Sequence, residues 1–472
     1  MMTQPFSLYV HIPFCTAKCT YCDFNSYAGQ DSLMRPYADA VAQEAALWAP
    51  HVEDRPVQTV FFGGGTPSLL PLPEMQVIVE ALRAHFGIEP GAEFSLEANP
   101  GTVDAAHLAG LRALGFNRIS FGVQSFHDDE LRTLERIHDA QEVEDAYRWA
   151  REAGFENVNL DLIYGLQGQS MQGWQTNLER ALALGPDHLS LYALTLEEGT
   201  PMTRDVERGR QRGPDLDLQA DMFEWSLEQL KQADYSHYEI SNWSRPDRQC
   251  RHNLVYWRNG DWLGLGAGAH SHLLGERFAD AASPRRYVEL VGESVRETGG
   301  LVAGASFESL KTNGFGQPAL ARYPTEATAS PTPGSPSPKS ERGLGGEVWP
   351  VFDTTSPSPI SGRGLRGGID PTRGVSPLDA MRQVVMREAP DQAREMAETV
   401  FLALRLREGL VIADFERRFG VDIRRVFGDA IDETRALGLT EEVDGRLRVP
   451  DAAVLLGDEA FVRFLAPAPV EA

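Results

Sequence analysis

Three of the four cysteines of this 472-residue chain lie in one short segment, HIPFCTAKCTYCDFN, at positions 11–25. Cys15, Cys19 and Cys22 are separated by three and two residues, so their thiolates can gather around one loop. Clustered cysteines of this kind indicate metal or redox chemistry. Three thiolates suit a 4Fe–4S cluster, because a cluster bound by three cysteines keeps one iron open for a small molecule.

The residues alone leave two other interpretations of this loop. A structural zinc ion needs four ligands in a closed site, and either His11 or the distant Cys250 could supply the fourth. Three unrelated buried thiols are the second alternative, which the crowding of the cysteines disfavours.

The elements that would position this loop are short apolar runs that alternate with helical patterns between residue 6 and about residue 196. The runs are FSLYVHI, VQTVFFGG, EFSLEA, RISFGVQS, NVNLDLIYG and HLSLYALT. Strands that alternate with helices form right-handed βαβ units and a parallel sheet. Six such units are too few for a closed eight-stranded barrel, so we predict an α/β fold with an open, partial (β/α)6 barrel.

Polar residues and glycines follow the predicted strands at the edge where barrel chemistry is found. FFGGGTP ends the second strand, and its glycines let backbone groups approach a ligand closely. Glu97 ends the third strand, Gln124 ends the fourth, and Asp161 lies in the fifth. Any one of these residues is more often a cap or a local hydrogen-bond partner, but their convergence on one mouth favours a binding site.

The motif Cys-x-x-x-Cys-x-x-Cys after a first strand, here CTAKCTYC, resembles the signature of the radical S-adenosylmethionine superfamily. The resemblance implies that Cys15, Cys19 and Cys22 hold a 4Fe–4S cluster. It also implies that the methionyl amino and carboxylate groups of S-adenosylmethionine bind the open iron. The glycines of GGGTP look like the stretch of this family that binds the methionyl amino group.

A wider set of segments resembles oxygen-independent coproporphyrinogen III oxidases and the related HemW-type haem chaperones: YVHIPFC, GGGTPS, LEANPGT, RISFGVQSF, RIHDA and NLDLIYGLQGQ. This resemblance covers about residues 6 to 300 and, more loosely, 378 to 460. Carried over by position, Tyr9, Gly64 and Glu97 would contact S-adenosylmethionine at the cluster. Further positions match those that line a second such site in the oxidases, whose occupancy here stays open: Tyr21, Gly65, Thr66, Gln124, Arg136 and Asp161.

Two features separate the chaperones from the oxidases. The oxidases carry a further cysteine two residues after the motif, where this chain has Phe24, and CDFNSY is the form seen in the chaperones. The segment CRHNLVYW, which begins at Cys250, resembles the H-N-x-x-Y-W motif of the chaperones. A neutral imidazole can ligate haem iron, so the resemblance implies haem binding with His252 as the iron ligand. The alternative for His252 is a hydrogen-bonded histidine of the core.

The function that the resemblance implies is that of a haem chaperone, which holds haem and passes it to an acceptor hemoprotein, such as a respiratory one. The cluster and S-adenosylmethionine would then support or gate transfer. The alternative is an oxygen-independent coproporphyrinogen III oxidase, in which a radical abstracts hydrogen from a propionate side chain before decarboxylation. A third interpretation is a zinc-bound barrel with an unrelated small substrate.

The overall composition limits the partners of the protein. The formal net charge of −24 argues against a nucleic-acid binder, because phosphate neutralisation requires a basic face. No apolar stretch approaches the length needed to span a bilayer, so we expect membrane association to be peripheral at most. The start MMTQPFSLYV has no basic region followed by a long apolar run, which predicts a cytoplasmic protein with reduced thiols.

We predict four regions along the chain. Residues 1–200 form the partial barrel, and residues 201–310 extend it and carry the HNLVYW segment. Residues 311–377 are rich in Pro, Gly and Ser and contain an imperfect repeat, SPSPKSERGLGGE and SPSPISGRGLRGG, which predicts a disordered insertion. Residues 378–472 read as a small, mostly helical domain that resembles a winged helix.

Overall fold

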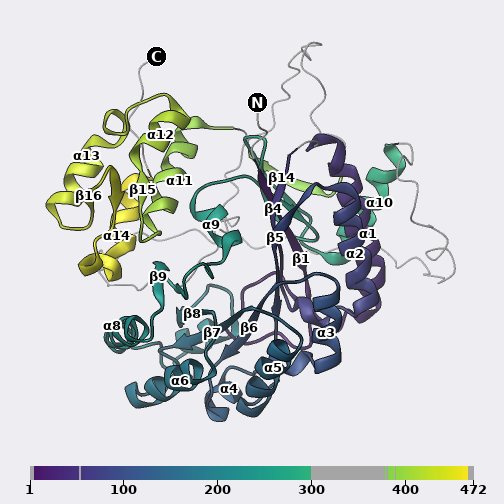
Figure 1. Ribbon diagram of the computed structural model, residues 1–472, viewed down its shortest axis with the longest axis horizontal. Helices are drawn as coiled ribbons and strands as arrows, with labels where there is room; N and C mark the ends of the chain where they lie inside the picture. Colours follow the sequence, from purple (N-terminus) through teal and green to yellow (C-terminus); the bar gives the residue numbers. More distant parts are fainter. Residues whose placement is uncertain (1–4, 53–54, 299–377, 379–380, 389, 466–472) are drawn as a thin grey trace.

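The computed structural model describes residues 5–52, 55–298, 378, 381–388 and 390–465. Their main feature is a 12-stranded sheet, in which six central strands are parallel neighbours in chain order (Figure 1). These six strands coincide with the six apolar runs of the sequence, so the predicted α/β fold is confirmed. They are β1 (Phe6–Ile12), β4 (Val57–Gly64), β5 (Ile88–Ala98), β6 (Arg118–Gln124), β7 (Asn157–Tyr164) and β8 (His188–Ala193).

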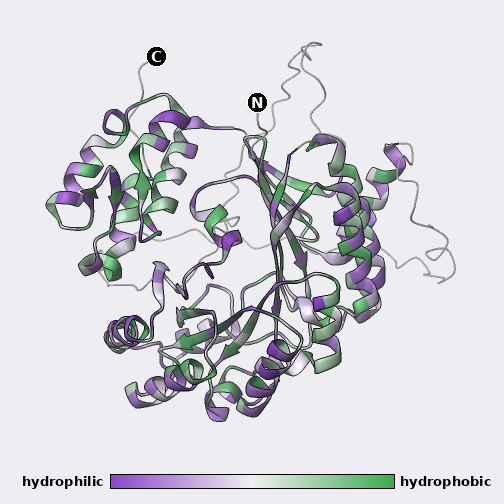
Figure 2. Cartoon of the chain, in the orientation of Figure 1, coloured by the Kyte–Doolittle hydropathy of each residue, from purple (hydrophilic) through white to green (hydrophobic). Residues whose placement is uncertain are grey.

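Successive side chains of these strands point to opposite faces of the sheet, and this alternation separates the core from a polar interior. In β6, Ile119, Phe121 and Val123 are buried in the main hydrophobic core, whereas Arg118 and Ser120 line a cavity inside the barrel. Figure 2 shows hydrophobic residues along the strands and hydrophilic residues on the outer surfaces of the surrounding helices. Apolar burial therefore holds the helices on the sheet and leaves the inner face to polar groups.

Helices cover the outer face of the sheet (Figure 1). Several begin at residues that cap their first N–H groups: Asp139 and Glu142 form a capping box, and the Ser170 side chain accepts from the Gly173 N–H. One of them ends at Gly185, whose φ of 69° is the left-handed conformation that glycine adopts readily. The covering helices include α1 (Met34–Trp48), α2 (Leu72–His85), α3 (Ala105–Ala113), α5 (Ala140–Glu152), α6 (Met171–Leu184) and α8 (Leu216–Gln232).

Further strands extend the parallel core at both edges. The strand beside β1 is also parallel to it, and the strands beyond are antiparallel. At the other edge, two short antiparallel strands follow β8. They are β11 (Trp262–Leu265), β12 (His270–Leu273), β13 (Glu276–Asp280) and β14 (Val384–Glu388) at the first edge, and β10 (Asn242–Ser244) and β9 (Ser236–Glu239) at the second. Because β14 pairs with β13, the chain returns to the barrel sheet before its C-terminal helices begin.

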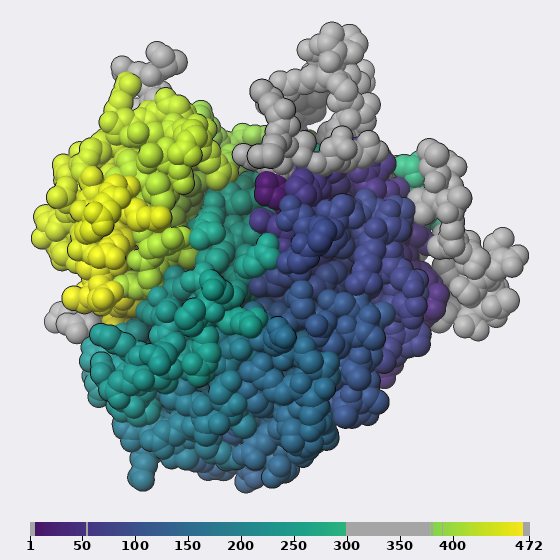
Figure 3. Space-filling view, viewed as in Figure 1, coloured from purple at the N-terminus to yellow at the C-terminus, as the bar shows by residue number. Residues whose placement is uncertain are grey.

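The C-terminal part has a hydrophobic core of its own, which includes Val400, Phe415, Phe427 and Phe464. Beside its helices it contains a three-stranded sheet of order β15-β17-β16, in keeping with the small, mostly helical domain expected here. In the space-filling view this part lies against the teal segment that follows the parallel strands (Figure 3). Its elements are α11 (Gln392–Leu404), β15 (Leu410–Val411), α12 (Ile412–Phe419), α13 (Ile423–Ala436), β16 (Glu441–Val443), β17 (Arg446–Arg448) and α14 (Gly457–Phe461).

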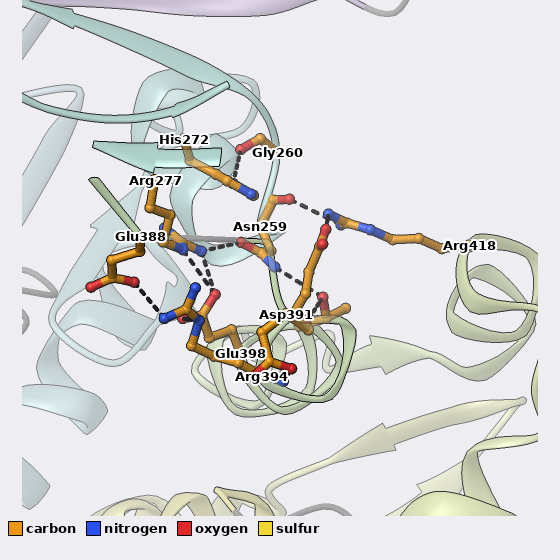
Figure 4. Close-up of polar contacts among 11 residues, drawn as sticks. Asn259, Gly260, His272, Arg277, Glu388, Asp391, Arg394, Glu398 and Arg418 are labelled. Carbon is orange, nitrogen blue, oxygen red and sulfur yellow. Dashed lines mark hydrogen bonds and ion pairs between the residues drawn. The ribbon is translucent and has the colours of Figure 1, made fainter. Parts of the chain in front are cut away.

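A polar network joins the C-terminal helices to the edge of the barrel sheet (Figure 4). Arg277 of β13 donates to Glu398 of α11 at 2.5 Å and 3.0 Å and to the Asn259 side chain at 2.8 Å. The Asn259 amide donates in turn to Thr399 of α11 at 3.0 Å, and Arg418 of α12 donates to the Asn259 backbone carbonyl at 2.9 Å. We call these five residues the interface network.

Some expectations from the sequence concern residues or boundaries that the structure does not test. The insertion predicted at 311–377, with its repeat, lies outside the described residues. The four predicted region boundaries stay predictions. Within the described ranges, none of the helices combines the length and the apolar character needed to cross a membrane.

Candidate functional site

The three clustered cysteines lie at one end of the barrel, where β1 leads into a loop. Cys15 ends the short strand β2 (Phe14–Cys15), and Cys19 and Cys22 follow in the loop, which is tightened by a hydrogen bond from the Cys22 N–H to the Cys19 carbonyl. The loop is held by β3 (Tyr27–Ala28), which pairs with β2. All three thiols are free and half-buried, and all three line one cavity of about 260 Å³.

Most of the residues singled out in the sequence meet at this cavity. The walls come from β4, β5, β6, β7 and β8, so the carboxyl ends of the parallel strands do converge on one mouth. Tyr9 does not line the cavity but is stacked on Phe61, which does, with ring centroids 6.3 Å apart. The predicted residues that line it are Cys15, Cys19, Tyr21, Cys22, Gly64, Gly65, Thr66, Glu97, Gln124, Arg136 and Asp161.

The glycine stretch after β4 brings the backbone of two strands together under the cysteine loop. Gly64 has a φ of 111°, and its N–H donates to the Glu97 carboxylate at 3.1 Å. A Cβ on Gly65 would lie 2.7 Å from the Phe14 carbonyl, immediately before Cys15. A side chain at either position would therefore displace neighbouring groups, and at Gly64 the positive φ also favours glycine.

Asn99 links two contacts of the cysteine loop, and the sequence analysis missed it. Its amide donates to the Thr66 hydroxyl at 3.1 Å, and the Thr66 hydroxyl lies 3.5 Å from the Cys15 sulfur. Its carbonyl oxygen accepts from Arg136, whose other terminal nitrogen donates to the Cys19 sulfur at 3.7 Å. Asn99 stands in LEANPGT directly after the third strand, where its position could have identified it.

Two carboxyl groups inside the cavity have altered acidity. Burial, reinforced by the nearby Asp161, raises the pKa of Glu97 to about 8, although the Gly64 N–H opposes this rise. Burial also raises the pKa of Asp161, while bonds from Ser120 at 2.9 Å and Asn159 at 2.7 Å favour its charged form. Glu97 is therefore largely uncharged near neutral pH, which reduces its repulsion of an anionic ligand.

Gln124 combines two features that are typical of binding sites. Its φ of 67° is unusual for a residue other than glycine, and it ends β6 at the cavity mouth. Its side-chain oxygen is buried, and no described residue donates to it. A buried acceptor without a protein partner is suited to a donor on a ligand.

The HNLVYW segment forms α9 (Arg251–Trp257), which closes the barrel at the end opposite the cysteine loop. Glu93 of β5 accepts from the backbone N–H groups of Arg251 at 2.9 Å and His252 at 3.0 Å, which fixes the helix start. His252 is fully buried, and its ring nitrogens lie 2.7 Å from the Thr59 hydroxyl and 2.9 Å from the Tyr256 hydroxyl.

The structure therefore does not bring His252 into the cavity, although its neighbour Asn253 lines the cavity from below. Tyr256 and Trp257, expected to offer flat faces to a porphyrin, are each only 6% exposed. In the described conformation His252 is a hydrogen-bonded histidine of the barrel floor. Its role as an iron ligand stays a prediction, and it requires α9 to shift.

Comparison with known proteins supports the family resemblance that the sequence motifs indicated. The Radical SAM superfamily matches residues 9–181, and the HemN C-terminal domain matches residues 391–456. The "Heme chaperone HemW" of Mycobacterium tuberculosis is 40% identical over 313 residues, which are 66% of this chain and 79% of that protein. The protein of the same name from Synechocystis is 42% identical over 292 residues, 61% of this chain and 70% of that one.

Among solved structures, the coproporphyrinogen III oxidase HemN from Escherichia coli superposes with a TM-score of 0.70. The match covers 98% of this chain and 91% of that one at 22% identity, so it bears on the fold alone. It confirms the predicted partial barrel with a helical C-terminal domain. Fold and cysteine loop together define a radical S-adenosylmethionine protein. Within that class, the identity with the curated relatives shows that the chain belongs to the HemW family.

The cysteine loop fits an iron–sulfur cluster better than a zinc ion. The two candidates for a fourth zinc ligand are engaged elsewhere: His11 bonds to Tyr9 and to the Asn25 carbonyl, and Cys250 lies 3.6 Å from Glu93. No three His, Cys, Asp or Glu side chains in the described part of the chain lie close enough to hold a single metal ion. A cluster takes its thiolates on separate irons, so its ligands lie farther apart than those of one ion.

Proposed function

We propose that this protein is a haem chaperone that binds haem and passes it to an acceptor hemoprotein. The proposal rests on the sequence identity of 40–42% with proteins named heme chaperone HemW. The cysteine loop and the barrel match the same class of protein. Phe24 supports the chaperone over the oxidase, since it occupies the position of the additional cysteine. Its ring is 46% exposed and lines the cavity mouth, so it offers an apolar surface there.

Cys15, Cys19 and Cys22 would hold the 4Fe–4S cluster, and S-adenosylmethionine would bind beside it at the mouth. When bound, this pair supplies one-electron chemistry. Burial raises the pKa of Cys22 to about 11, so its thiol must release a proton when it binds metal. The glycines and Glu97 would receive the methionyl group, because the Gly64 backbone and the Glu97 carboxyl already meet there.

A second S-adenosylmethionine site is the part of the proposal that depends most on the resemblance. Tyr21, Gln124, Arg136 and Asp161 line the same cavity as the predicted first site. The side-chain oxygen of Gln124, which is buried without a donor among the described residues, supports a ligand that carries hydrogen-bond donors. A stoichiometry of two S-adenosylmethionine molecules per cluster-loaded chain, measured by equilibrium dialysis, would support this arrangement. A stoichiometry of one would contradict it.

The experiment that tests the function pairs two assays on protein purified and reconstituted without oxygen. Haem is titrated into the cluster-loaded chain and followed by its absorption, and coproporphyrinogen is offered to the same preparation with a reductant and S-adenosylmethionine. We expect tight haem binding and no decarboxylation. Decarboxylation without haem binding would assign the chain to the oxidases.

The predicted iron ligand has its own test, designed around the burial of His252. His252→Ala should abolish or greatly weaken haem binding and leave the cluster intact. Tyr256→Phe is the matched control, because it removes the hydroxyl partner of His252 and keeps the imidazole. If His252 binds haem, hydrogen exchange across α9 should also rise when haem is added, since the helix must leave the floor. Unchanged haem binding in His252→Ala would place the ligand elsewhere.

A further inference from the structure

Arg118 lies at the floor of the barrel cavity, and the proposed cluster and S-adenosylmethionine sites give it no role. It begins β6, and its side chain is 3% exposed. Because it lines the cavity together with Asn253 of α9, it faces the space between the barrel floor and the cysteine mouth. Sequence reasoning treated RISFGVQSF as a motif and missed this residue. The alternation along β6, which places Arg118 beside Ser120 on the inner face, could have identified it.

The guanidinium of Arg118 has no hydrogen-bond acceptor within the described part of the chain. Its Nε atom is buried without a partner, and no carboxylate of the described residues lies within ion-pair distance of it. An arginine stays charged in proteins, so burial cannot be relieved by loss of a proton. A buried charge without a direct partner is strongly unfavourable, and the usual solution is a partner of opposite charge.

The acidic neighbours of Arg118 are committed to other groups. Both oxygens of Glu93 accept from the start of α9, at the N–H groups of Arg251 and His252. The oxygens of Asp161 accept from Ser120 and Asn159, and Glu97 accepts from Gly64. Burial lowers the pKa of Arg118, but neighbouring groups that include Glu93 and Asp161 raise it through space by more. None of them supplies the close, paired contact that a guanidinium favours.

A second orphaned group lies on the same floor. The side-chain oxygen of Asn253 is buried and, within the described ranges, has no donor. Asn253 follows His252, which with Cys250 belongs to the segment that closes the barrel. An amide can present either its oxygen or its NH₂ to a ligand, so Asn253 can adapt to the group that Arg118 binds. Two unsatisfied polar groups at the base of one cavity indicate a ligand.

We propose that the floor of the cavity binds a carboxylate of a ligand that enters from the cysteine mouth, with Arg118 as the charged partner. The planar fork of arginine matches a carboxylate in two parallel hydrogen bonds. The proposal rests on the proposed function for its two candidate sources, which share this chemistry: a propionate of haem and the methionyl carboxylate of an S-adenosylmethionine molecule. Arg118 begins β6, whereas the three cysteines that would hold the cluster lie in the loop at the mouth.

The test compares each acid with an analogue that lacks the carboxylate, using the cluster-reconstituted full chain. The probes are haem and haem dimethyl ester, and S-adenosylmethionine and its decarboxylated form. The proteins are the parent, Arg118→Gln and the matched control Arg112→Gln. Arg112 lies on the outside of the barrel and donates to the carbonyls of Gly154 and Phe116.

We expect Arg118→Gln to weaken the binding of one of the two acids by roughly tenfold to hundredfold, because hydrogen bonds to its charged carboxylate are lost. The corresponding analogue should bind the parent and Arg118→Gln alike, and Arg112→Gln should match the parent throughout. If only haem binding is weakened, the floor binds the haem propionate. If only S-adenosylmethionine binding is weakened, the floor binds the methionyl carboxylate.

Equal binding of both acids by Arg118→Gln and the parent would overturn the proposal. Equal weakening of an acid and its analogue would overturn it too, because the effect would then be structural. If Arg118→Gln does not hold a cluster, Arg118→Lys keeps the charge without the fork and should show a smaller selective loss of the same acid. A parent that binds S-adenosylmethionine but no haem would contradict the proposed function, while the S-adenosylmethionine arm would still decide the role of Arg118.

Discussion

Two buried arginines of this protein have opposite surroundings. Arg277 in the interface network is 7% exposed and donates to Glu398 and Asn259 (Figure 4). Arg118 at the cavity floor is 3% exposed and has no acceptor among the described residues. Burial alone therefore does not separate a structural charge from a binding one. The difference lies in whether the protein itself supplies the partner.

The same contrast extends to the neighbours of the two arginines. In the interface network, the side-chain oxygen of Asn259 accepts from Arg277, and its NH₂ group donates to the Thr399 hydroxyl. In the cavity, the side-chain oxygens of Gln124 and Asn253 are buried and accept no hydrogen bond from the residues that the structure describes. The interface network supplies its buried arginine with a carboxylate and joins the C-terminal helices to the barrel, whereas no described residue supplies a carboxylate to Arg118 at ion-pair distance.

The largest effect should come from the cysteine loop. Replacing Cys15, Cys19 or Cys22 by Ala should abolish the cluster, because each thiolate binds a different iron. The measurement is the iron and sulfide content and the visible absorption of the reconstituted protein. Cys250→Ala is the control, since its buried thiol contacts Glu93 far from the loop, and it should keep a full cluster.

The interface network should have the next largest effect. Glu398→Ala removes the carboxylate that accepts two hydrogen bonds from the buried Arg277, and breaking a buried pair in this way costs about 3–5 kcal/mol. Chemical denaturation measures the loss. The control is Arg286→Ala, which removes an exposed pair with Glu289 and should cost less than about 1 kcal/mol. If both variants lose the same unfolding free energy, the buried Arg277–Glu398 pair contributes no more to stability than an exposed ion pair.

The acidity of Glu97 should appear in the pH dependence of stability in the cluster-free protein. Its pKa rises from 4.5 to about 8 on folding, so the folded state favours the protonated carboxyl. That contribution is complete below pH 4.5 and is lost as the pH rises through 8. The parent should therefore lose a few kcal/mol relative to Glu97→Gln between about pH 5 and pH 8. Parallel curves of unfolding free energy against pH would show that Glu97 is not perturbed.

Arg118 should give the smallest effect on stability, and this is the sharpest contrast with Arg277. Arg118→Gln should lower the unfolding free energy of the ligand-free protein by less than about 1 kcal/mol, because no hydrogen bond to a described residue is lost and an unpaired buried charge is removed. Denaturation under the conditions used for Glu398→Ala provides the comparison. A loss as large as that of Glu398→Ala would mean that Arg118 is a structural residue with partners inside the protein.

The sequence was sufficient for the features that depend on local patterns. Apolar runs separated by helical segments predicted the six parallel strands, and motif spacing predicted the cysteine loop. The polar residues after successive strands, such as Glu97 and Gln124, did meet at one mouth, because parallel strands end at the same edge of a sheet.

The features that sequence reasoning missed depend on contacts between distant segments. The burial of His252 follows from a bond to Thr59, which lies 193 residues earlier. Similarly, Arg277 and Glu398 are 121 residues apart, and no local pattern pairs them. Trp257 of HNLVYW matched a motif, but its packing against Leu402 and Leu406 is a property of the assembled fold.

The most direct test of the central claim is haem transfer. The cluster-loaded protein, charged with one equivalent of haem, is mixed with an excess of a haem-free acceptor hemoprotein, and the two are separated and analysed by absorption. We predict that haem leaves this protein and appears in the acceptor with the spectrum of the native hemoprotein. Haem that stays bound to this protein throughout, or a cluster-loaded protein that binds no haem and decarboxylates coproporphyrinogen, would contradict the account.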